Sequence, residues 1–493
     1  MEYYEVAPMR IARAGHDTFT YASDQPLLQG HIVIVELGKK EIVGVVIKKV
    51  QRPSYETKPI VSRVEETPLP AGLITTMLWM SVYYATPLAT VLQTVLPRGI
   101  TKTRRVRTEA AHISSRDRTH FLLNNRQQAA VDTVVNMTSG SALLHGITGS
   151  GKTRVYIELA QKTIAKGSSA VILVPEIALT SQLVDEFSHH FSDIILTHSR
   201  QTEAERHTAW RTALESNQPR VVVGPRSALF MPLKHIGLIV IDEAHEPSFK
   251  QEQAPRYSAL RVASTYAQAN KGKAIFGSAT PLIADYFLAE HSGRPVISMD
   301  TRAKDDASAP TVQLIDLTKK PLFKKHRFLS DLLLAKLEAT FASGNQALIF
   351  HNRRGSASTT LCENCGWTAT CGRCFIPFTL HADHHTLACH ICGAKDRVPT
   401  SCPECGQADV IHKGIGTKLI ESELRKVFPK QTIARFDADT PPNESVDTRY
   451  PELYSGAIDL IIGTQVIAKG LDLPKLRTVG VIQADAGLSM PDY

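Results

Sequence analysis

The eight cysteines of this chain give the most specific indication of its chemistry. They form four C-x-x-C pairs, and all lie between residues 362 and 405 of a 493-residue sequence. Each pair can give two thiolates to one metal, and four thiolates make the tetrahedral site that zinc prefers. We therefore predict two zinc ions, held by Cys362, Cys365, Cys371, Cys374, Cys389, Cys392, Cys402 and Cys405.

The spacing of the pairs favours one division of these ligands without deciding it. Five residues separate the first two pairs, whereas fourteen separate the middle two. We favour a nested arrangement, in which the two middle pairs bind one zinc and the two outer pairs bind the other. Sequential pairing is the alternative. An iron–sulfur cluster is a further one, although four pairs with interleaved glycines suit structural zinc better.

A second segment has the spacing of a phosphate-binding loop. The sequence "GITGSGKT" (146–153) follows an apolar run, precedes a helical pattern and fits G-x-x-x-x-G-K-[ST]. Glycines let backbone N–H groups close around phosphate oxygens, while Lys152 reaches the β and γ phosphates and Thr153 ligates magnesium. The predicted ATP-binding residues here are Gly146, Thr148, Gly149, Ser150, Gly151, Lys152 and Thr153.

An acidic pair supplies the second half of such a site. In "GLIVIDEAH" (237–245), Asp242 follows a continuous apolar run that is typical of a buried strand. We predict that Asp242 holds magnesium through water and that Glu243 is the general base for an attacking water molecule. Together with Lys152, these two carboxylates are the predicted catalytic residues.

Alternating strands and helices position both motifs. Between 121 and about 298, the apolar runs "ALLHG", "AVILVP", "IILTH", "RVVVG", "LIVID" and "KAIFGSAT" alternate with helical segments. This βαβ pattern predicts a parallel sheet covered on both faces. The pattern returns after 300, with helices over 330–343 and 417–428 and strands such as "QALIFHN" and "DLIIGT". We predict two α/β domains, the second interrupted by the cysteines.

The first hundred residues differ from the rest. "HIVIVELGKKEIVGVVIKKV" (31–50) has two β-branched runs joined by "GKK", which indicates a hairpin, and a helical stretch follows around 74–96. Residues 1–100 are therefore expected to form a β-rich domain. Residues 101–120 are polar and arginine-rich, and we interpret them as a solvated tether, with a basic arm that contacts phosphates as the alternative.

Composition narrows the class of protein. A net charge of +8 and a pI near 9.0 favour an anionic partner such as nucleic acid. We see no secretory signal and no apolar run of 18 residues, so we expect no membrane association and a cytoplasmic location. There thiols stay reduced, which favours metal ligands over disulfides.

The motifs together resemble a known family. The phosphate loop, "DEAH" and "GSATP" (277–281), in this order, resemble a superfamily 2 helicase motor. "VPEIALTSQL", "GPRSALF", "DEAHEPSFKQEQAPRYSALRVA", "IGTQVIAKGLDLP" and the eight-cysteine insert resemble the PriA family of bacterial replication-restart helicases. The resemblance implies two RecA-like lobes, at 121–298 and 299–493, with the two-zinc insert at 357–413 of lobe two. It also supports the nested pairing.

The resemblance assigns further residues in the motor. It implies that Gln127 lies on the adenine side of ATP and that "SAT" (278–280) links hydrolysis to lobe movement. It places an aromatic-rich loop at 248–257 near single-stranded DNA, where we choose Phe249, Lys250 and Arg256 as DNA contacts. Ordinary packing is the alternative for Phe249. We expect Thr464, Gln465 and Lys469 to face either the nucleotide or the DNA backbone.

In the N-terminal domain the resemblance implies capture of a DNA 3′ end. "TFTYAS" (18–23) and "LGKKE" (37–41) match the relevant segments, which makes Phe19, Gly38 and Lys39 candidate DNA contacts. Thr20 stands where this family usually has an acidic residue, so this position departs from the pattern expected for 3′-end capture. A structural role for Phe19 is the alternative.

Three departures from the family pattern affect the expected activity. The short linker leaves no room for the winged-helix domain of the family. The sequence stops at "ADAGLSMPDY", before the arginine-bearing motif, and such an arginine can contribute ~10³–10⁵ in rate. The sheet of lobe two is then expected to have an unpaired edge. A fragment of a longer product is the simplest explanation, and a natural short form is the alternative.

The family implies an ATP- and magnesium-dependent 3′-to-5′ DNA helicase that starts replication restart at stalled forks. Its implied partners are single-stranded and branched DNA, primosome proteins and single-strand-binding proteins, and we expect a monomer associated with the nucleoid. A hydrolysis-deficient scaffold that binds nucleotide and DNA is the alternative. A different translocase of the same superfamily is a third reading, disfavoured by the cysteine insert.

Overall fold

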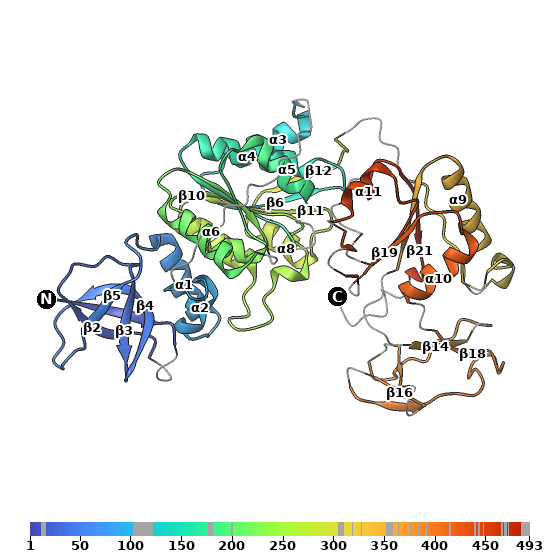
Figure 1. Ribbon diagram of the computed structural model, residues 1–493, viewed down its shortest axis with the longest axis horizontal. Coiled ribbons are helices and arrows are strands. Elements are labelled where there is room, and N and C mark those ends of the chain that lie inside the picture. Colours follow the sequence, from blue (N-terminus) through green and yellow to red (C-terminus); the bar gives the residue numbers. More distant parts are fainter. Residues whose placement is uncertain are drawn as a thin grey trace. The chain divides into compact units, whose positions relative to one another are not determined.

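The computed structural model divides the chain into two compact units, Met1–Ser308 and Ala309–Tyr493. The N-terminal β-rich residues and the first α/β lobe share the first unit (Figure 1). The second unit holds the second lobe and the cysteine-rich insert. The structure describes all residues except 11–15, 102–121, 176–180, 199–200, 304–309, 318, 327, 352–357, 363, 375–376, 382–384, 390–391, 414–415, 438–439, 442–443, 447, 465–466, 468–470, 472 and 485–493.

An antiparallel sheet of order β2-β1-β4-β3-β5 forms the N-terminal domain. The hairpin predicted from "GKK" is confirmed, because Leu37 pairs with Lys40 across a turn made by Gly38 and Lys39. Gly38 has φ +65°, which a glycine adopts without steric cost. The strands are β1 (Glu2–Pro8), β2 (Phe19–Ser23), β3 (Ile32–Leu37), β4 (Lys40–Val50) and β5 (Ile60–Arg63).

Two helices follow this sheet where the sequence indicated one helical stretch. They are α1 (Ala71–Tyr83) and α2 (Leu88–Val95), and Pro87 caps the second. Proline lacks an N–H donor and disfavours helical backbone in the preceding residue, so the pattern breaks at this point. Buried residues of α1, including Met77 and Met80, share one hydrophobic core with residues of lobe one.

Lobe one is a seven-stranded sheet of order β12-β6-β11-β10-β7-β9-β8, whose paired strands run parallel. All six predicted strands are confirmed, and β12 is additional. The strands are β6 (Gly140–Gly146), β7 (Ser169–Leu173), β8 (Ile194–Leu196), β9 (Val221–Gly224), β10 (Ile236–Ile241), β11 (Lys273–Ser278) and β12 (Val296–Met299).

Helices cover both faces of this sheet (Figure 1). Leu238 and Val240 pack with α3 and α4, whereas Ile239 and Ile241 pack with α6 and α7, because side chains alternate along a strand. The helices are α3 (Asn125–Asn136), α4 (Lys152–Ala165), α5 (Ser181–His190), α6 (Glu203–Glu215), α7 (Ala259–Ala269) and α8 (Ile283–His291), with short 3₁₀ turns at Arg226–Phe230 and Pro247–Phe249.

Lobe two has a four-stranded parallel sheet of order β19-β20-β13-β21. Within the described residues β21 lies at an edge, and its Val479 and Val481 are about half exposed. The strands are β13 (Gln346–Phe350), β19 (Ile433–Phe436), β20 (Leu460–Gly463) and β21 (Leu476–Val481), and the helices are α9 (Asp331–Ala342), α10 (Thr417–Val427) and α11 (Tyr450–Ser455), with a 3₁₀ turn at Lys320–Leu322.

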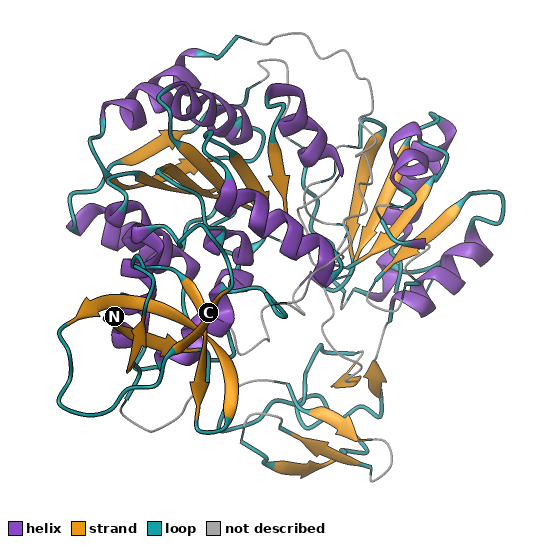
Figure 2. Cartoon of the chain, turned by 60° about the vertical axis from the view of Figure 1, so that its left-hand side comes forward, coloured by secondary structure: helices purple, strands orange, loops and turns teal. Residues whose placement is uncertain are grey.

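The cysteine-rich insert leaves the lobe after β13 and rejoins it before α10. Its described residues contain short strands and loops but no helix (Figure 2). The antiparallel order is β17-β16-β15-β14-β18. The strands are β14 (Ser358–Cys362), β15 (Thr379–His381), β16 (Thr386–Ala388), β17 (Lys395–Arg397) and β18 (Val410–Lys413). Across the described helices of the chain, none has both the length and the apolar content needed to cross a bilayer.

Candidate nucleotide site and metal centres

The phosphate loop joins β6 to α4 at the carboxyl end of the sheet. Gly151 is the N-cap of α4 and has φ +79°, in the left-handed region. This conformation favours glycine, and a Cβ atom at this position would also lie 2.3 Å from Nε2 of Gln127 on α3, which would have to move. The loop therefore presents the N-terminus of a 14-residue helix, where backbone N–H groups favour an anion.

Two side chains of the loop fit a phosphate ligand. Lys152 is buried, and its Nζ donates to the backbone carbonyl oxygen of Gly146 at 2.9 Å. The Oγ of Ser150 is also buried and has no hydrogen-bond partner among the described residues. Leaving such a hydroxyl unpaired costs about 1–3 kcal/mol, and a phosphate oxygen would satisfy it. The loop is thus suited to the phosphates of a nucleotide.

Gln127 contacts the loop rather than open space. Its Nε2 donates to the carbonyl oxygen of Ser150 at 3.2 Å, and its Oε1 accepts from the backbone N of Asn124 at 3.0 Å. The second bond belongs to a capping box at the start of α3. The side-chain amide of Gln127 therefore links the phosphate loop to the start of α3 in this structure, and its contact with adenine stays a prediction.

Asp242 lies directly after β10, facing the phosphate loop. Its backbone N donates to Leu173 O at 2.8 Å, and its Oδ1 accepts a hydrogen bond of 2.9 Å from the hydroxyl of Tyr156. Burial and the neighbouring Glu243 raise the pKa of Asp242 to about 6, while the charge of Lys152 acts in the opposite direction. Burial also raises the pKa of Tyr156 well above its usual value, so the hydroxyl remains a donor.

Glu243 has a backbone conformation that is unusual for its type. Its φ is +48°, a region that costs a non-glycine residue on the order of 1–3 kcal/mol. The turn is held by Glu246 N, which donates to Glu243 O, and by Ala244 N, which donates to Gly277 O, both at 2.8 Å. The side chain of Glu243 is 33% exposed, so its carboxylate can meet a water molecule, as a general base must.

Hydrogen bonds connect this acidic turn to the "GSAT" segment. Nδ1 of His245 lies 2.8 Å from Oγ of Ser278, which also accepts from the backbone N of Thr280 at 3.0 Å. A change in the conformation of the acidic turn would therefore alter the hydrogen bonds of residues 278–280.

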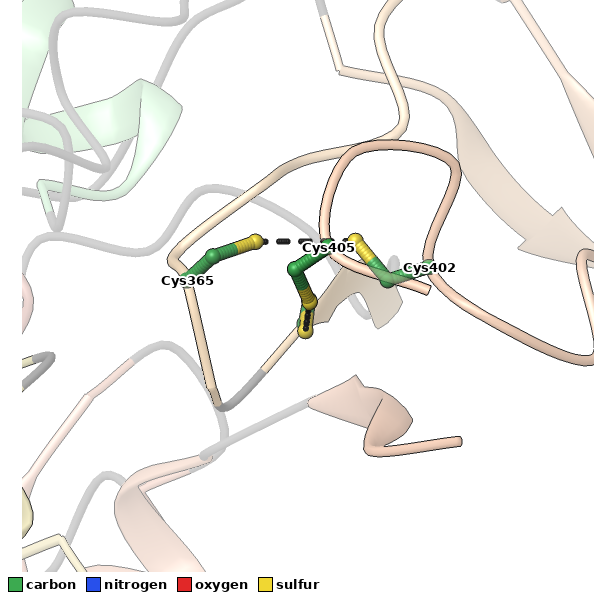
Figure 3. A group of neighbouring side chains, drawn as sticks. Cys365, Cys402 and Cys405 are labelled. Atoms are coloured by element: carbon green, nitrogen blue, oxygen red, sulfur yellow. Dashed lines mark hydrogen bonds between the residues drawn. The ribbon is translucent and has the colours of Figure 1, made fainter. Parts of the chain in front are cut away.

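The eight cysteines form two groups of four, and none is in a disulfide. The sulfur atoms of Cys362, Cys365, Cys402 and Cys405 lie within 4.8 Å of one another, and so do those of Cys371, Cys374, Cys389 and Cys392. These are the two sets of the nested arrangement. Figure 3 shows Cys365, Cys402 and Cys405 turned toward one another.

The sulfur spacing in both groups fits zinc. Sγ–Sγ distances are 3.6 Å for Cys362–Cys405, 3.5 Å for Cys365–Cys402 and 3.7 Å for Cys371–Cys392. A tetrahedron with Zn–S bonds of about 2.3 Å has edges of about 3.8 Å. Asn364 Nδ2 donates to Cys405 Sγ at 3.6 Å. This bond lowers the pKa of the Cys405 thiol and so favours the thiolate, which is the form that binds metal.

A shared turn shapes three of the four cysteine pairs. The residue after each second cysteine is a glycine with φ between +70° and +82°, and its N–H donates to the carbonyl oxygen of the first cysteine. This folds both thiols toward the same point. The glycines are Gly366, Gly393 and Gly406.

Comparisons with known proteins identify the family of this chain. Residues 124–286 match the family model described as DEAD/DEAH box helicase, and residues 10–97 match the model described as 3′DNA-binding domain (3′BD) of PriA. The replication restart protein PriA of Rickettsia conorii is 33% identical over 479 residues, which cover 95% of this chain and 72% of that protein. This chain belongs to the PriA family.

Other PriA proteins are similar over a shorter part of their length. PriA of Bacillus subtilis is 38% identical over 377 residues, which cover 75% of this chain and 47% of that protein. PriA of Treponema pallidum is 35% identical over 418 residues, which cover 84% and 62%, respectively. The chain thus spans about half to two thirds of these two relatives.

The aromatic-rich loop of this PriA family member does not present Phe249 as expected. Phe249 is only 2% exposed and belongs to the hydrophobic core of lobe one, so it offers no ring face to a DNA base. The sequence pattern could not separate these roles, because an aromatic residue in a loop can face either way. Stacking of Phe249 on DNA does not fit this structure, and packing accounts for the residue.

Lys250 and Arg256 stay candidate DNA contacts, because both are exposed. Lys250 Nζ donates to Arg256 O at 2.6 Å and lies 5.9 Å from the ring centroid of Tyr84, at the end of α1. Arg226, from "GPRSALF", holds the base of the same loop through bonds to Ser248 O and Gln251 Oε1. No sequence pattern predicted this role of Arg226.

Replacing Phe249 by alanine is expected to lower the free energy of unfolding by about 3–5 kcal/mol, because it leaves a cavity in a core. Denaturant unfolding measures this. Phe287→Ala is the matched control: Phe287 is 53% exposed, so a change within about 0.5 kcal/mol is expected. Unchanged stability of Phe249→Ala, together with weaker binding of single-stranded DNA, would restore the stacking role.

The N-terminal candidates lie in the β3–β4 turn and at the start of β2. Gly38 and Lys39 are exposed in the β3–β4 turn, and Lys58 Nζ donates to Gly38 O at 2.6 Å. Phe19 is partly buried against the domain core. Thr20, at the position of the family's acidic residue, has its hydroxyl 3.0 Å from that of Tyr55. Their contacts with DNA stay predictions.

Some sequence predictions fall outside the described residues. Gln465 and Lys469 are among them, as are most of the linker and parts of "VPEIALTSQL". Thr464 is described, directly after β20, with its backbone N donating to Phe436 O at 3.3 Å.

Proposed function

We propose that this chain is an ATP-dependent 3′-to-5′ DNA helicase or translocase of the PriA type, which starts replication restart at stalled forks by binding branched DNA and recruiting primosome proteins. Support comes from family membership and from the match of residues 10–97 to a 3′ DNA-binding domain. The observation that carries the proposal is the phosphate loop, with buried Lys152 and the unpaired Ser150 hydroxyl, facing the Asp242–Glu243 turn.

Each residue of this site has a role in hydrolysis. Lys152 would exchange its bond to Gly146 O for the β and γ phosphates, and the Ser150 hydroxyl would donate to a phosphate oxygen. Thr153 and Asp242 would hold magnesium, which when bound neutralises phosphate charge. Glu243 would accept the proton of the attacking water, which its partial exposure permits.

DNA would contact exposed basic side chains of the first compact unit, Met1–Ser308. Lys250 and Arg256 of the aromatic-rich loop would contact the phosphates of a single strand, and Lys39 would contact DNA at the hairpin turn. The insert, with two zinc ions, would hold a rigid surface for DNA or partner proteins. We propose that the chain works as a cytoplasmic monomer with primosome and single-strand-binding proteins as partners.

Strand displacement on tailed duplexes tests this function. A 3′-to-5′ motor loads on a single-stranded 3′ tail, so ATP-dependent displacement is expected with a 3′ tail and not with a 5′ tail. Lys152→Ala on the same substrates is the control. Displacement from 5′ tails alone would contradict the polarity. No displacement, with nucleotide and DNA both bound, would favour the scaffold alternative.

A further inference from the structure

We propose that Tyr156 is a positioning residue for Asp242, whose hydroxyl fixes the carboxylate in the orientation that holds magnesium. This inference rests on the proposed function. Tyr156 lies four residues after Lys152 on α4, and its Oη donates to Oδ1 of Asp242 at 2.9 Å. Because this bond occupies one oxygen, it restricts rotation of the carboxylate and leaves the second oxygen available for a metal ion. The bond joins the helix of the phosphate loop to the strand of the acidic turn.

The neighbouring strand leaves room for this hydroxyl. A Cβ atom at Gly277 of β11 would lie 1.7 Å from Oη of Tyr156 and 3.5 Å from Oδ1 of Asp242. No side chain can therefore stand at position 277 while the bond exists. The backbone of Gly277 also accepts from Ala244 N, so the same strand supports the acidic turn. The three segments that form the predicted ATPase site thus meet at the Tyr156 hydroxyl.

Burial alone does not explain the bond. Tyr266 on α7 is as fully buried as Tyr156, against the opposite face of the same sheet. Its hydroxyl has no hydrogen-bond partner among the described residues. A large buried tyrosine in this lobe can therefore serve as packing only, and the contact of Tyr156 with Asp242 is specific to its place beside the site.

The test compares Tyr156→Phe with Tyr266→Phe in the full chain. Affinity for a slowly hydrolysed fluorescent ATP analogue is measured with magnesium and with EDTA. Groups that orient a metal ligand typically contribute about 10- to 100-fold in metal affinity or activity. Tyr156→Phe is expected to lose affinity by about this factor with magnesium and to match the wild type in EDTA, whereas Tyr266→Phe matches it in both.

Two results would overturn the inference. Tyr156→Phe with wild-type affinity in magnesium would show that the hydroxyl does not position Asp242. An equal loss in magnesium and in EDTA would show that it only shapes the phosphate loop. A wild-type chain that binds no nucleotide would instead contradict the proposed function, so the two failures are distinguishable.

Gly277→Ala gives a second route to the same contact. The added methyl group would displace the Tyr156 hydroxyl, so the variant is expected to lose magnesium-dependent affinity as Tyr156→Phe does. The loss should be smaller in the Tyr156→Phe background, because residues in contact are not additive. Fully additive losses would contradict the inference, and if Gly277→Ala does not fold, Tyr156→Phe alone decides.

Discussion

Removing zinc is expected to unfold residues 357–413 while lobe one still binds nucleotide. Among the described residues of the insert, one small hydrophobic cluster is buried, formed by Ala369, Phe378, Leu387 and the ligands Cys371 and Cys389. Such a core cannot offset the entropy of ordering the chain, whereas a structural zinc contributes on the order of 10 kcal/mol. The phosphate loop belongs to the other compact unit, so its affinity for nucleotide should be unchanged.

Limited proteolysis after chelation measures this effect. New cleavage sites are expected within the insert, with the fragment that carries lobe one still able to bind nucleotide. The metal content of the untreated protein should be two zinc ions per chain. Resistance of the insert to protease after complete loss of zinc would contradict a metal-dependent fold.

Paired cysteine variants test which thiols share a metal. Cys365→Ser with Cys405→Ser damages one group of the nested arrangement and should leave one zinc. Cys365→Ser with Cys371→Ser damages both groups and should leave none bound tightly. Sequential pairing predicts the reverse for the two double variants, so the zinc counts distinguish them.

Replacing Glu243 by glutamine is expected to lower kcat for ATP hydrolysis by about 10²–10⁴, because an amide cannot accept the proton of the attacking water. Affinity for ATP should stay close to that of the wild type, since glutamine keeps the shape of the side chain. Single-turnover hydrolysis and binding of a fluorescent nucleotide separate the two effects.

The matched control for this variant is Glu252→Gln, an exposed carboxylate of the aromatic-rich loop. It changes the same charge nine positions away and should leave hydrolysis unaltered if Glu243 is the base. Equal kcat for Glu243→Gln and the wild type would exclude Glu243 from that role.

Local sequence patterns predicted much of this fold because the elements are long or strongly apolar. The six predicted strands of lobe one are examples. Strand β12 was not predicted, since "VISM" is too short to distinguish from a loop. The break between α1 and α2 was missed because the apolar pattern continues through Pro87, whereas the backbone cannot.

The site was predictable where its residues are close in sequence. The phosphate loop and the acidic pair are such cases. Tyr156 was missed because its partner Asp242 is 86 residues away and a tyrosine on a helix is most often packing. The burial of Phe249 was also not predictable, because it depends on a core shared between the N-terminal helices and lobe one.

We propose that this chain is a DNA-dependent ATPase, and steady-state ATP hydrolysis with and without single-stranded DNA is the direct test of that claim. DNA is expected to raise turnover in the wild type, and Lys152→Ala is expected to abolish this activity, because the cation that contacts the phosphates is lost. Turnover in the presence of DNA at or below that of Lys152→Ala would contradict the claim.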